Sequence, residues 1–192
     1  MPNTTPKTSN LIITRIAAAL LDYCFVIGYA ILLFGLVGLL FGFEQLGTME
    51  FSPAAGQLIA FSTLTLPVFL YFFLQEKSAK KGTIGKRALR LQVEMIQDSS
   101  NHTRGILIRT VLKLLPWEIA HWGIQWLAFY TKKGMELPIW VWVLLIVPQV
   151  VAFFYFVSML YTKGTLSFYD AIAGTKVVKQ GSNKVGNKTY NF

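Results

Sequence analysis

The sequence has one cysteine, Cys24, and only two histidines among its 192 residues. A single cysteine excludes an intramolecular disulfide, and a lone thiol at the edge of an apolar segment is interpreted as a packing residue. The sequence also lacks a Walker loop, a dinucleotide-binding glycine motif, a nucleophile elbow and a zinc-protease motif. We therefore expect no enzymatic activity, no cofactor and no metal site.

Charged residues are also scarce, at 14% of the chain, whereas 54% of the residues are hydrophobic. Three long runs contain no charge at all, namely 23–43, 51–75 and 137–162. At about 1.5 Å per helical residue, each is long enough to cross roughly 30 Å of hydrocarbon. The composition therefore predicts an all-α integral membrane protein.

A fourth run, 105–131, is apolar but contains two basic residues, a glutamate and a histidine. One interpretation is a membrane-spanning helix, and the other is an amphipathic helix that lies flat in the headgroup layer. With the first interpretation the chain is a four-pass helical bundle. The predicted domain covers 1–179, with a disordered polar tail over 180–192 and helices at about 14–43, 51–76, 105–131 and 137–162.

The net charge of +9 is distributed unevenly along the chain. All but two of the 18 lysines and arginines lie near the N-terminus, in 77–113, or beyond residue 162. The positive-inside rule therefore predicts a bacterial inner-membrane protein with both termini and the central loop in the cytoplasm. Anionic lipid headgroups explain the basic charge without a nucleic acid partner. The residues expected at this surface are Lys80, Lys81, Lys86, Arg87 and Arg90.

Two segments after the second and fourth apolar runs resemble each other. They read KKGTIGKRALRLQVEM (80–95) and TKGTLSFYDAIAGTKVVK (162–179), and their Lys-Gly-Thr triplets lie 82 positions apart. Two passes separate them, which predicts the same membrane side and a bundle of two parallel two-helix repeats. The alternation of 89–95 and the segment after Gly174 predict two short strands, which can pair antiparallel. The alternative is two unrelated basic loops.

Three pieces of the chain resemble the RDD family of bacterial membrane proteins, named for an arginine and two aspartates. They are TRIAAALLDY, with Arg15 and Asp22; GTIGKRALRLQV; and YDAIAGTKVV, with Asp170. Tyr169 stands where a histidine often precedes the aspartate in the family. The resemblance implies a multi-pass inner-membrane protein, and the family is linked to cation/proton antiport.

Arg15 and Asp22 are seven residues apart, so about 10.5 Å of helix rise separates them and they are not expected to pair. Arg15 is instead expected to form a structural clamp with Asp170 at the inner end of the last pass. Asp22 has a second interpretation as an ion or proton site, because ionisable groups inside a membrane are functional candidates.

Glu118 and His121 lie about one helical turn apart, so both can face one cavity. Pro116 frees the carbonyl of Leu112 and adds a polar group to this region. A buried glutamate beside a histidine suits proton exchange, whereas the interfacial interpretation places both in the headgroup layer. Glu-x-x-His is also a metal-ligand spacing, but a metal site needs further ligands that the sequence does not supply.

The leading hypothesis is a small transporter that exchanges monovalent cations for protons through Asp22, Glu118 and His121. Because four passes are few for an antiporter, a homo-oligomer is then expected. The alternative is a non-transporting membrane module that assembles or recruits partners through its basic cytoplasmic face. Transport predicts that Glu118 and His121 line a polar cavity near Asp22, whereas assembly predicts that they point to the headgroups.

Overall fold

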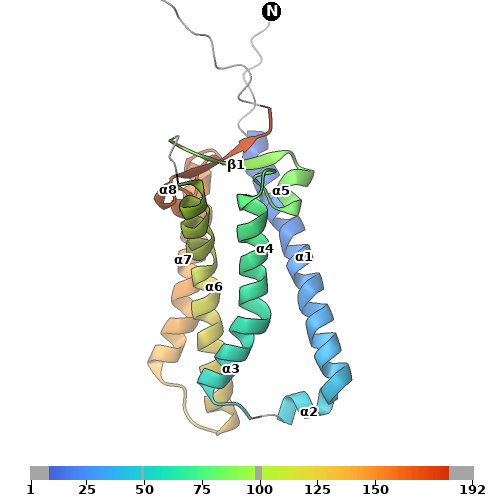
Figure 1. Ribbon diagram of the computed structural model, residues 1–192. Helices are drawn as coiled ribbons and strands as arrows, with labels where there is room; N and C mark the ends of the chain where they lie inside the picture. The colour runs from blue at the N-terminus through green and yellow to red at the C-terminus, as the bar shows by residue number, and fades with distance from the viewer. Residues whose placement is uncertain (1–8, 49, 98–100, 182–192) are drawn as a thin grey trace, which may run out of the picture.

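The computed structural model describes residues 9–48, 50–97 and 101–181, and four long helical segments run between its two ends (Figure 1). The first is linked to the second by the short helix α2 (Phe43–Thr48). The four segments are α1 (Ser9–Phe41), the continuous α3 (Pro53–Ala60), η1 (Phe61–Thr65) and α4 (Leu66–Lys77), then α6 (His102–Lys132) and α7 (Ile139–Tyr161).

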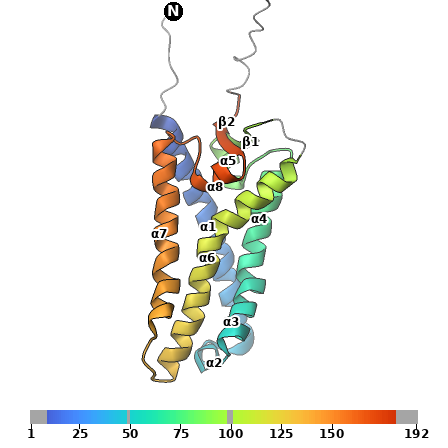
Figure 2. The same ribbon diagram turned by 90° about the vertical axis from the view of Figure 1, so that its left-hand side faces the viewer.

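Three of these segments are long and apolar enough to cross a membrane, by length and composition: Leu11–Phe41, Pro53–Lys77 and Ile139–Tyr161. They agree with the uncharged runs of the sequence and make the protein a helical membrane protein with a small sheet. The fourth, α6, is interrupted by charged residues. It nevertheless runs along the bundle beside α7, α3 and α4 and does not lie flat across its end (Figure 2).

The α3–α4 segment contains a π-helical turn, Phe61–Thr65, just before Pro67. Proline at this position leaves the carbonyl of Thr63 without its helical partner. The hydroxyl of Tyr29 on α1 donates to that carbonyl at 2.5 Å. A tyrosine from a neighbouring helix thus satisfies the freed backbone group and ties α1 to this segment.

Pro116 has the same effect inside α6, where it frees the carbonyl of Leu112. The hydroxyl of Tyr155 on α7 donates to this carbonyl at 3.2 Å. The freed group therefore helps to join α6 to α7. It does not contribute to a site with Glu118 and His121.

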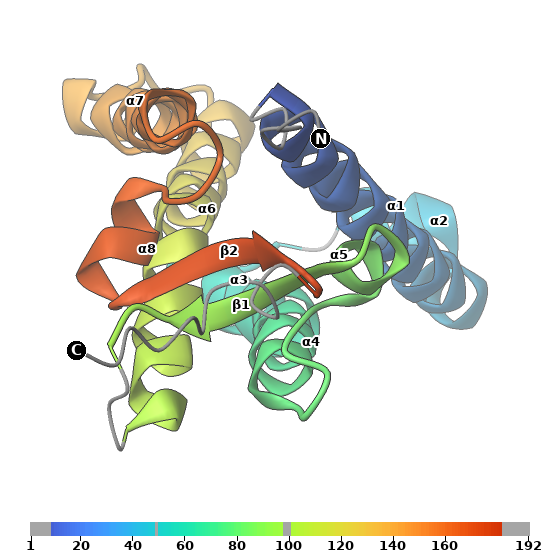
Figure 3. The same ribbon diagram turned by 90° about the horizontal axis from the view of Figure 1, so that it is seen from above.

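Two short strands, β1 (Leu91–Met95) and β2 (Thr175–Lys179), pair antiparallel with Val93 opposite Val177. This confirms the antiparallel pairing that the sequence allowed. Seen from above, the sheet lies across one end of the bundle, with α5 (Ile84–Ala88) beside α1 and α8 (Phe168–Ile172) beside α6 (Figure 3).

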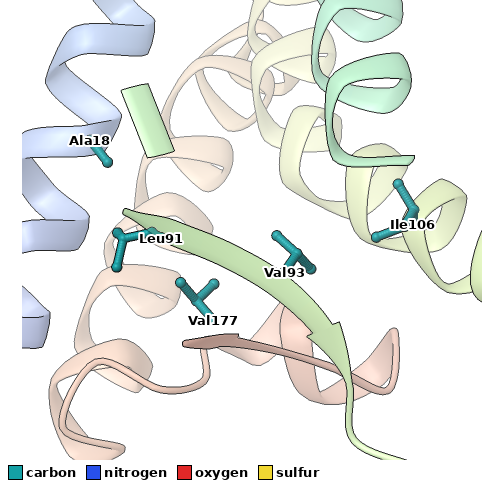
Figure 4. Close-up of a cluster of buried hydrophobic side chains, with 5 residues drawn as sticks. All are labelled: Ala18, Leu91, Val93, Ile106 and Val177. Atoms are coloured by element: carbon teal, nitrogen blue, oxygen red, sulfur yellow. The ribbon is translucent and has the colours of Figure 1, made fainter. Parts of the chain in front are cut away.

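Alternate residues of the sheet point toward the helices and form the hydrophobic core of this end. Val93 and Val177 are fully buried and Leu91 nearly so. They pack with Ala18 of α1 and Ile106 of α6 (Figure 4). The period-2 pattern of the strands thus fixes the sheet on the bundle, because a shift of one residue would turn these side chains to solvent.

Two segments of this end have matching local structure at a spacing of 84 residues. Thr83 and Ser167 are the N-caps of α5 and α8, and each helix has five residues. The amide of Val93 donates to the carbonyl of Lys81, and the amide of Val177 donates to that of Thr165. The Lys-Gly-Thr triplets lie 82 positions apart and are therefore not equivalent in this local structure.

Candidate functional site

Asp22 joins α1 to the N-terminus of α5. Its side chain is 3% exposed and accepts hydrogen bonds from the hydroxyls of Tyr71 and Thr83 and from the amide of Gly85, at 2.8, 2.6 and 2.9 Å. A Cβ on Gly85 would lie 2.2 Å from the carbonyl oxygen of Ala18, so only glycine permits this approach. Asp22 is thus held by three fixed donors.

Arg15 joins α1 to α8 and to the loop before it. Its guanidinium pairs with Asp170 at 2.9 Å and donates to the carbonyl of Gly164 at 2.8 Å. Asp170 is fully buried and also accepts hydrogen bonds from the amide and hydroxyl of Ser167, which caps α8. The pairing of Arg15 with Asp170 expected from the sequence is therefore present.

Glu76, at the end of α4, is the centre of a network that sequence reasoning missed. It is 1% exposed, and its two oxygens pair with Lys86 at 2.5 Å and with Arg109 at 2.8 Å. Arg109, also 1% exposed, pairs on its other side with Asp170. Charges of alternating sign thus run through the buried end of the bundle, from Lys86 through Glu76, Arg109 and Asp170 to Arg15.

The sequence carried a signal for this network. Glu76 follows an uncharged run directly, and Arg109 interrupts an apolar one, so both are ionisable groups at the edge of the membrane region. What the sequence did not show was which group each would meet. Lys86 and Asp170 occupy equivalent positions of the two matching segments, 84 residues apart, and place opposite charges at the two sides of the network.

Lys86 was expected at the membrane surface, and this is wrong, because its side chain is buried against Glu76. The helix α5 turns it inward between α4 and α1. Arg87 is half-buried and donates to the carbonyl of Gly82 at 2.5 Å. Of the other expected surface residues, Lys80, Lys81 and Arg90 are exposed.

A cavity of about 260 Å³ lies beside this network, where α1, α4, α6 and α7 meet. Its charged lining consists of Asp22 and four cations, Arg15, Lys86, Arg109 and Lys113. Apolar and aromatic side chains make up most of the rest. Among the described residues, Glu118 and His121 do not line it, so the structure does not bring those two residues to a cavity with Asp22.

Glu118 lies farther along α6 and faces α3. The amide nitrogen of Gln57 donates to its Oε1 at 2.5 Å. The other carboxylate oxygen, Oε2, and the Gln57 Oε1 are both buried and have no hydrogen-bond partner among the described residues. No described basic residue forms an ion pair with Glu118.

His121 points elsewhere. Its Nδ1 lies 3.0 Å from the carbonyl of Trp117 on the same helix, and the two rings are 4.5 Å apart between centroids. The expected pair of Glu118 and His121 is thus not formed, because the two side chains turn to different neighbours. Gln57, which the sequence analysis did not single out, takes the place of the histidine.

A second cavity, of about 370 Å³, lies at the opposite end of the bundle from the sheet, between the start of α3 and the end of α6. Gln125, Ser52 and Glu50 are among its lining residues. Gln125 is two helical turns from Glu118, and its side chain contacts the position of Gly56 on α3. Polar groups therefore continue from this cavity toward Gln57 and Glu118.

The fold and the buried ion network define a helical membrane protein whose charged groups gather at the end that carries the sheet. The model of the RDD family matches residues 11–174, which is most of the chain, and the protein belongs to this family. Arg15, Asp22 and Asp170 all lie in the matched region. Comparison with curated proteins and with solved structures gave no significant match.

Proposed function

We propose that this protein is a small membrane transporter that exchanges monovalent cations for protons at Glu118 and Gln57. The observation that carries the proposal is the difference in hydrogen-bond partners between Glu118 and the other buried carboxylates. Asp22, Glu76 and Asp170 each accept from several fixed donors. Glu118 instead has one neutral partner and a buried oxygen without any partner among the described residues.

One carboxylate can serve both ions if they compete for it. When Glu118 is ionised, its oxygens and the Oε1 of Gln57 offer the hard oxygen ligands that a monovalent cation takes. When Glu118 is protonated, its O–H donates to the amide oxygen and the cation leaves. Rotation of the amide lets Gln57 donate in one state and accept in the other. Competition for this position gives exchange without a second titrating group.

Polar groups along the interface between the α3–α4 segment and α6 support a route to this position. Gln57, Thr65 and Glu76 are buried polar residues of the α3–α4 segment. On α6, Lys113 lies five residues from Glu118, about 7.5 Å of rise. The π-helical turn begins four residues after Gln57, and π-helical turns are frequent at functional sites. Pro116 lies two residues before Glu118 on α6.

For the topology we propose four membrane passes, with α6 as the third pass along the chain. The four passes form two repeats of two helices each. The sheet end carries exposed basic residues, which supports an orientation toward the anionic lipid of the cytoplasmic leaflet, with both termini in the cytoplasm of a bacterium. Its exposed residues include Lys77, Lys80, Lys81, Arg90, Arg104, Lys163 and Lys179. Glu44, Glu50 and Glu136 are exposed at the other end. We also propose that the transporter is a homo-oligomer, because four passes are few for an antiporter.

Within this proposal Asp22, Arg15 and Asp170 position the sheet end and do not titrate during exchange. The pair of Arg15 and Asp170 clamps α8 to α1, and Asp22 clamps α5 to α1. His121 is not part of the binding position, because its ring is bound to its own helix.

A second candidate function is a non-transporting module that recruits a partner through the exposed basic residues of the sheet end. The observation in its favour is the clustering of these residues around one small sheet, which offers a compact cationic surface. This function needs neither Glu118 nor Gln57.

The two functions are separated by proteoliposomes that contain an internal pH dye. Wild type is expected to move protons when a gradient of a monovalent cation is applied. Glu118→Gln is expected to abolish this movement, because an amide cannot release a proton. Glu136→Gln, which changes an exposed acid in the connection between α6 and α7, is the matched control and should retain the wild-type rate.

If wild type moves no protons against any monovalent cation, the transport proposal is wrong and recruitment remains. If wild type transports and Glu118→Gln transports equally well, the assignment of the site to Glu118 is wrong. Gln57→Leu, which removes the amide but keeps the size of the side chain, is expected to slow exchange and not to abolish it.

A further inference from the structure

The cavity beside the ion network has more hydrogen-bond donors than acceptors. Both oxygens of Glu76 and both oxygens of Asp170 are already bound to cations. Asp22 is likewise held by hydroxyls and an amide. A guanidinium carries five N–H donors and an ammonium carries three. Arg15 donates to Gly164 and Asp170, and Lys86 donates to Glu76, so both groups have more donors than these acceptors take up.

The charges around the cavity are also unbalanced. Four cations, Arg15, Lys86, Arg109 and Lys113, meet three carboxylates, those of Asp22, Glu76 and Asp170. The three carboxylates therefore leave one of the four cations without a carboxylate partner in a largely buried place, where an unpaired charge is costly. An anion that entered the cavity would both neutralise this charge and accept the spare donors.

Lys113 is the cation that the protein leaves without an acid. Among the described residues it forms no ion pair, and its ammonium lies over the ring of Phe72, 3.3 Å from the centroid. Every other cation of the cavity is bound to a carboxylate. Lys113 is therefore the residue best placed to bind an incoming anion.

Tyr169, which also lines the cavity, responds to the same field. Burial raises the pKa of its hydroxyl, but the positive charges of Arg109 and Arg15 lower it by more, so that it falls to about 7. Arg109 also lies 5.1 Å from the centre of the Tyr169 ring. A phenol that ionises this readily indicates that the cavity favours negative charge.

The shape of the cavity adds an apolar part to the site. Phe72, Met159 and Leu91 line the cavity. Leu20 on α1 and Phe156 on α7 also line it, and the side chains of both are partly exposed at the surface. The exposed Leu20 and Phe156 show that the wall of the cavity reaches the outer surface of both α1 and α7. A molecule with an anionic head and a hydrocarbon chain fits both parts.

We propose that this cavity binds a phosphate group, with Lys113, Arg15, Lys86 and Arg109 as donors, and that its source is the headgroup of an anionic phospholipid. The hydrocarbon chains of that lipid would lie against the exposed side chains of α1 and α7. Glu118 and Gln57 do not line this cavity, and lipid binding there can be tested whether or not the protein transports ions.

The test measures the thermal stability of the purified chain in a zwitterionic detergent with three added probes. These are a short-chain phosphatidylglycerol, the phosphatidylcholine with the same chains, and inorganic phosphate. The proposal expects phosphatidylglycerol to raise the Tm in a saturable manner and phosphatidylcholine not to do so. Stabilisation by inorganic phosphate alone, at equal or lower concentration, would keep the anion site but overturn the lipid as its source.

Lys113→Met tests the site, and Lys77→Met is its matched control. Lys77 also lies over a phenylalanine ring, that of Phe73, but it is exposed at the end of α4. Lys113→Met is expected to weaken phosphatidylglycerol binding roughly 10- to 100-fold, the range for one lost hydrogen bond to a charged group. Lys77→Met removes only one of several exposed basic residues of the sheet end and is expected to weaken phosphatidylglycerol binding far less than Lys113→Met does.

Lys113→Arg keeps the positive charge and is expected to retain phosphatidylglycerol binding. It provides a second test if Lys113→Met does not fold, and loss of binding in a folded Lys113→Arg would contradict the role of the charge. Equal stabilisation by both lipids, or equal weakening by Lys113→Met and Lys77→Met, would overturn the proposal. So would binding in Lys113→Met that matches the wild type.

Discussion

Glu76 offers the sharpest test of how the buried charges act. Its carboxylate is the shared partner of Lys86 and Arg109, and all three side chains are buried. Glu76→Gln keeps the shape of the side chain but removes the negative charge, so the buried Lys86 loses its carboxylate partner and the buried Arg109 keeps only Asp170. Breaking a buried ion pair from one side costs about 3–5 kcal/mol.

This loss is measurable as a shift in Tm. For a chain of this size, 1 kcal/mol corresponds to roughly 2–4 °C, so Glu76→Gln is expected to lower the Tm by about 6–20 °C. The assay is thermal unfolding of the purified protein in detergent, followed by the fluorescence of its tryptophans. Glu136→Gln removes an exposed acid outside the network and is expected to change the stability by less than about 0.5 kcal/mol.

A double variant shows whether charge is the cause. Glu76→Gln with Lys86→Met removes one charge of each sign, so the excess of positive charge returns to its wild-type value. The double variant is expected to lose less unfolding free energy than the sum of the losses of the two single variants, and the difference should be about 0.5–3 kcal/mol. Strictly additive losses, or a Tm of Glu76→Gln equal to that of the control, would refute the reasoning.

Three other changes test separate parts of the sheet end. Gly85→Ala places a Cβ against the carbonyl of Ala18 and should lower the Tm, whereas Gly28→Ala, with nothing within 4 Å, should not; equal Tm values would contradict the close packing of α1 on α5. Asp22→Asn loses the charge that three donors stabilise and should cost about 2–4 kcal/mol in thermal unfolding, and a wild-type Tm would show that Asp22 is not a structural clamp. Because the pKa of Tyr169 is lowered to about 7, its ionised form should add stability that is fully present above about pH 10 and lost as the pH falls through 7. An absorbance rise at 295 nm near pH 7 that Tyr169→Phe removes would confirm it, and an unchanged titration curve would contradict it.

The sequence by itself determined the features that depend on neighbours along the chain. Uncharged runs predicted the long apolar helices, because hydrocarbon accepts only segments without exposed charge. The alternation around Val93 predicted a strand with one buried face. Gly174, with φ +66°, ends the helix turn before β2 as expected, because glycine adopts this conformation without strain. The pair of Arg15 and Asp170 was also predicted, because both residues were expected at the inner ends of their helices.

Tertiary structure alone decided which polar groups meet when they come from different helices. Glu76 and Arg109 are 33 positions apart, and Gln57 and Glu118 are 61 apart, so no local pattern links either pair. The spacing of 84 residues between the two matching segments was likewise set by hydrogen bonds of backbone groups, which a shared triplet of side chains does not report. Hydropathy fixes how deep a residue lies, but the rotation of each helix about its axis decides which neighbour its side chain reaches. That rotation is determined by packing across the whole bundle.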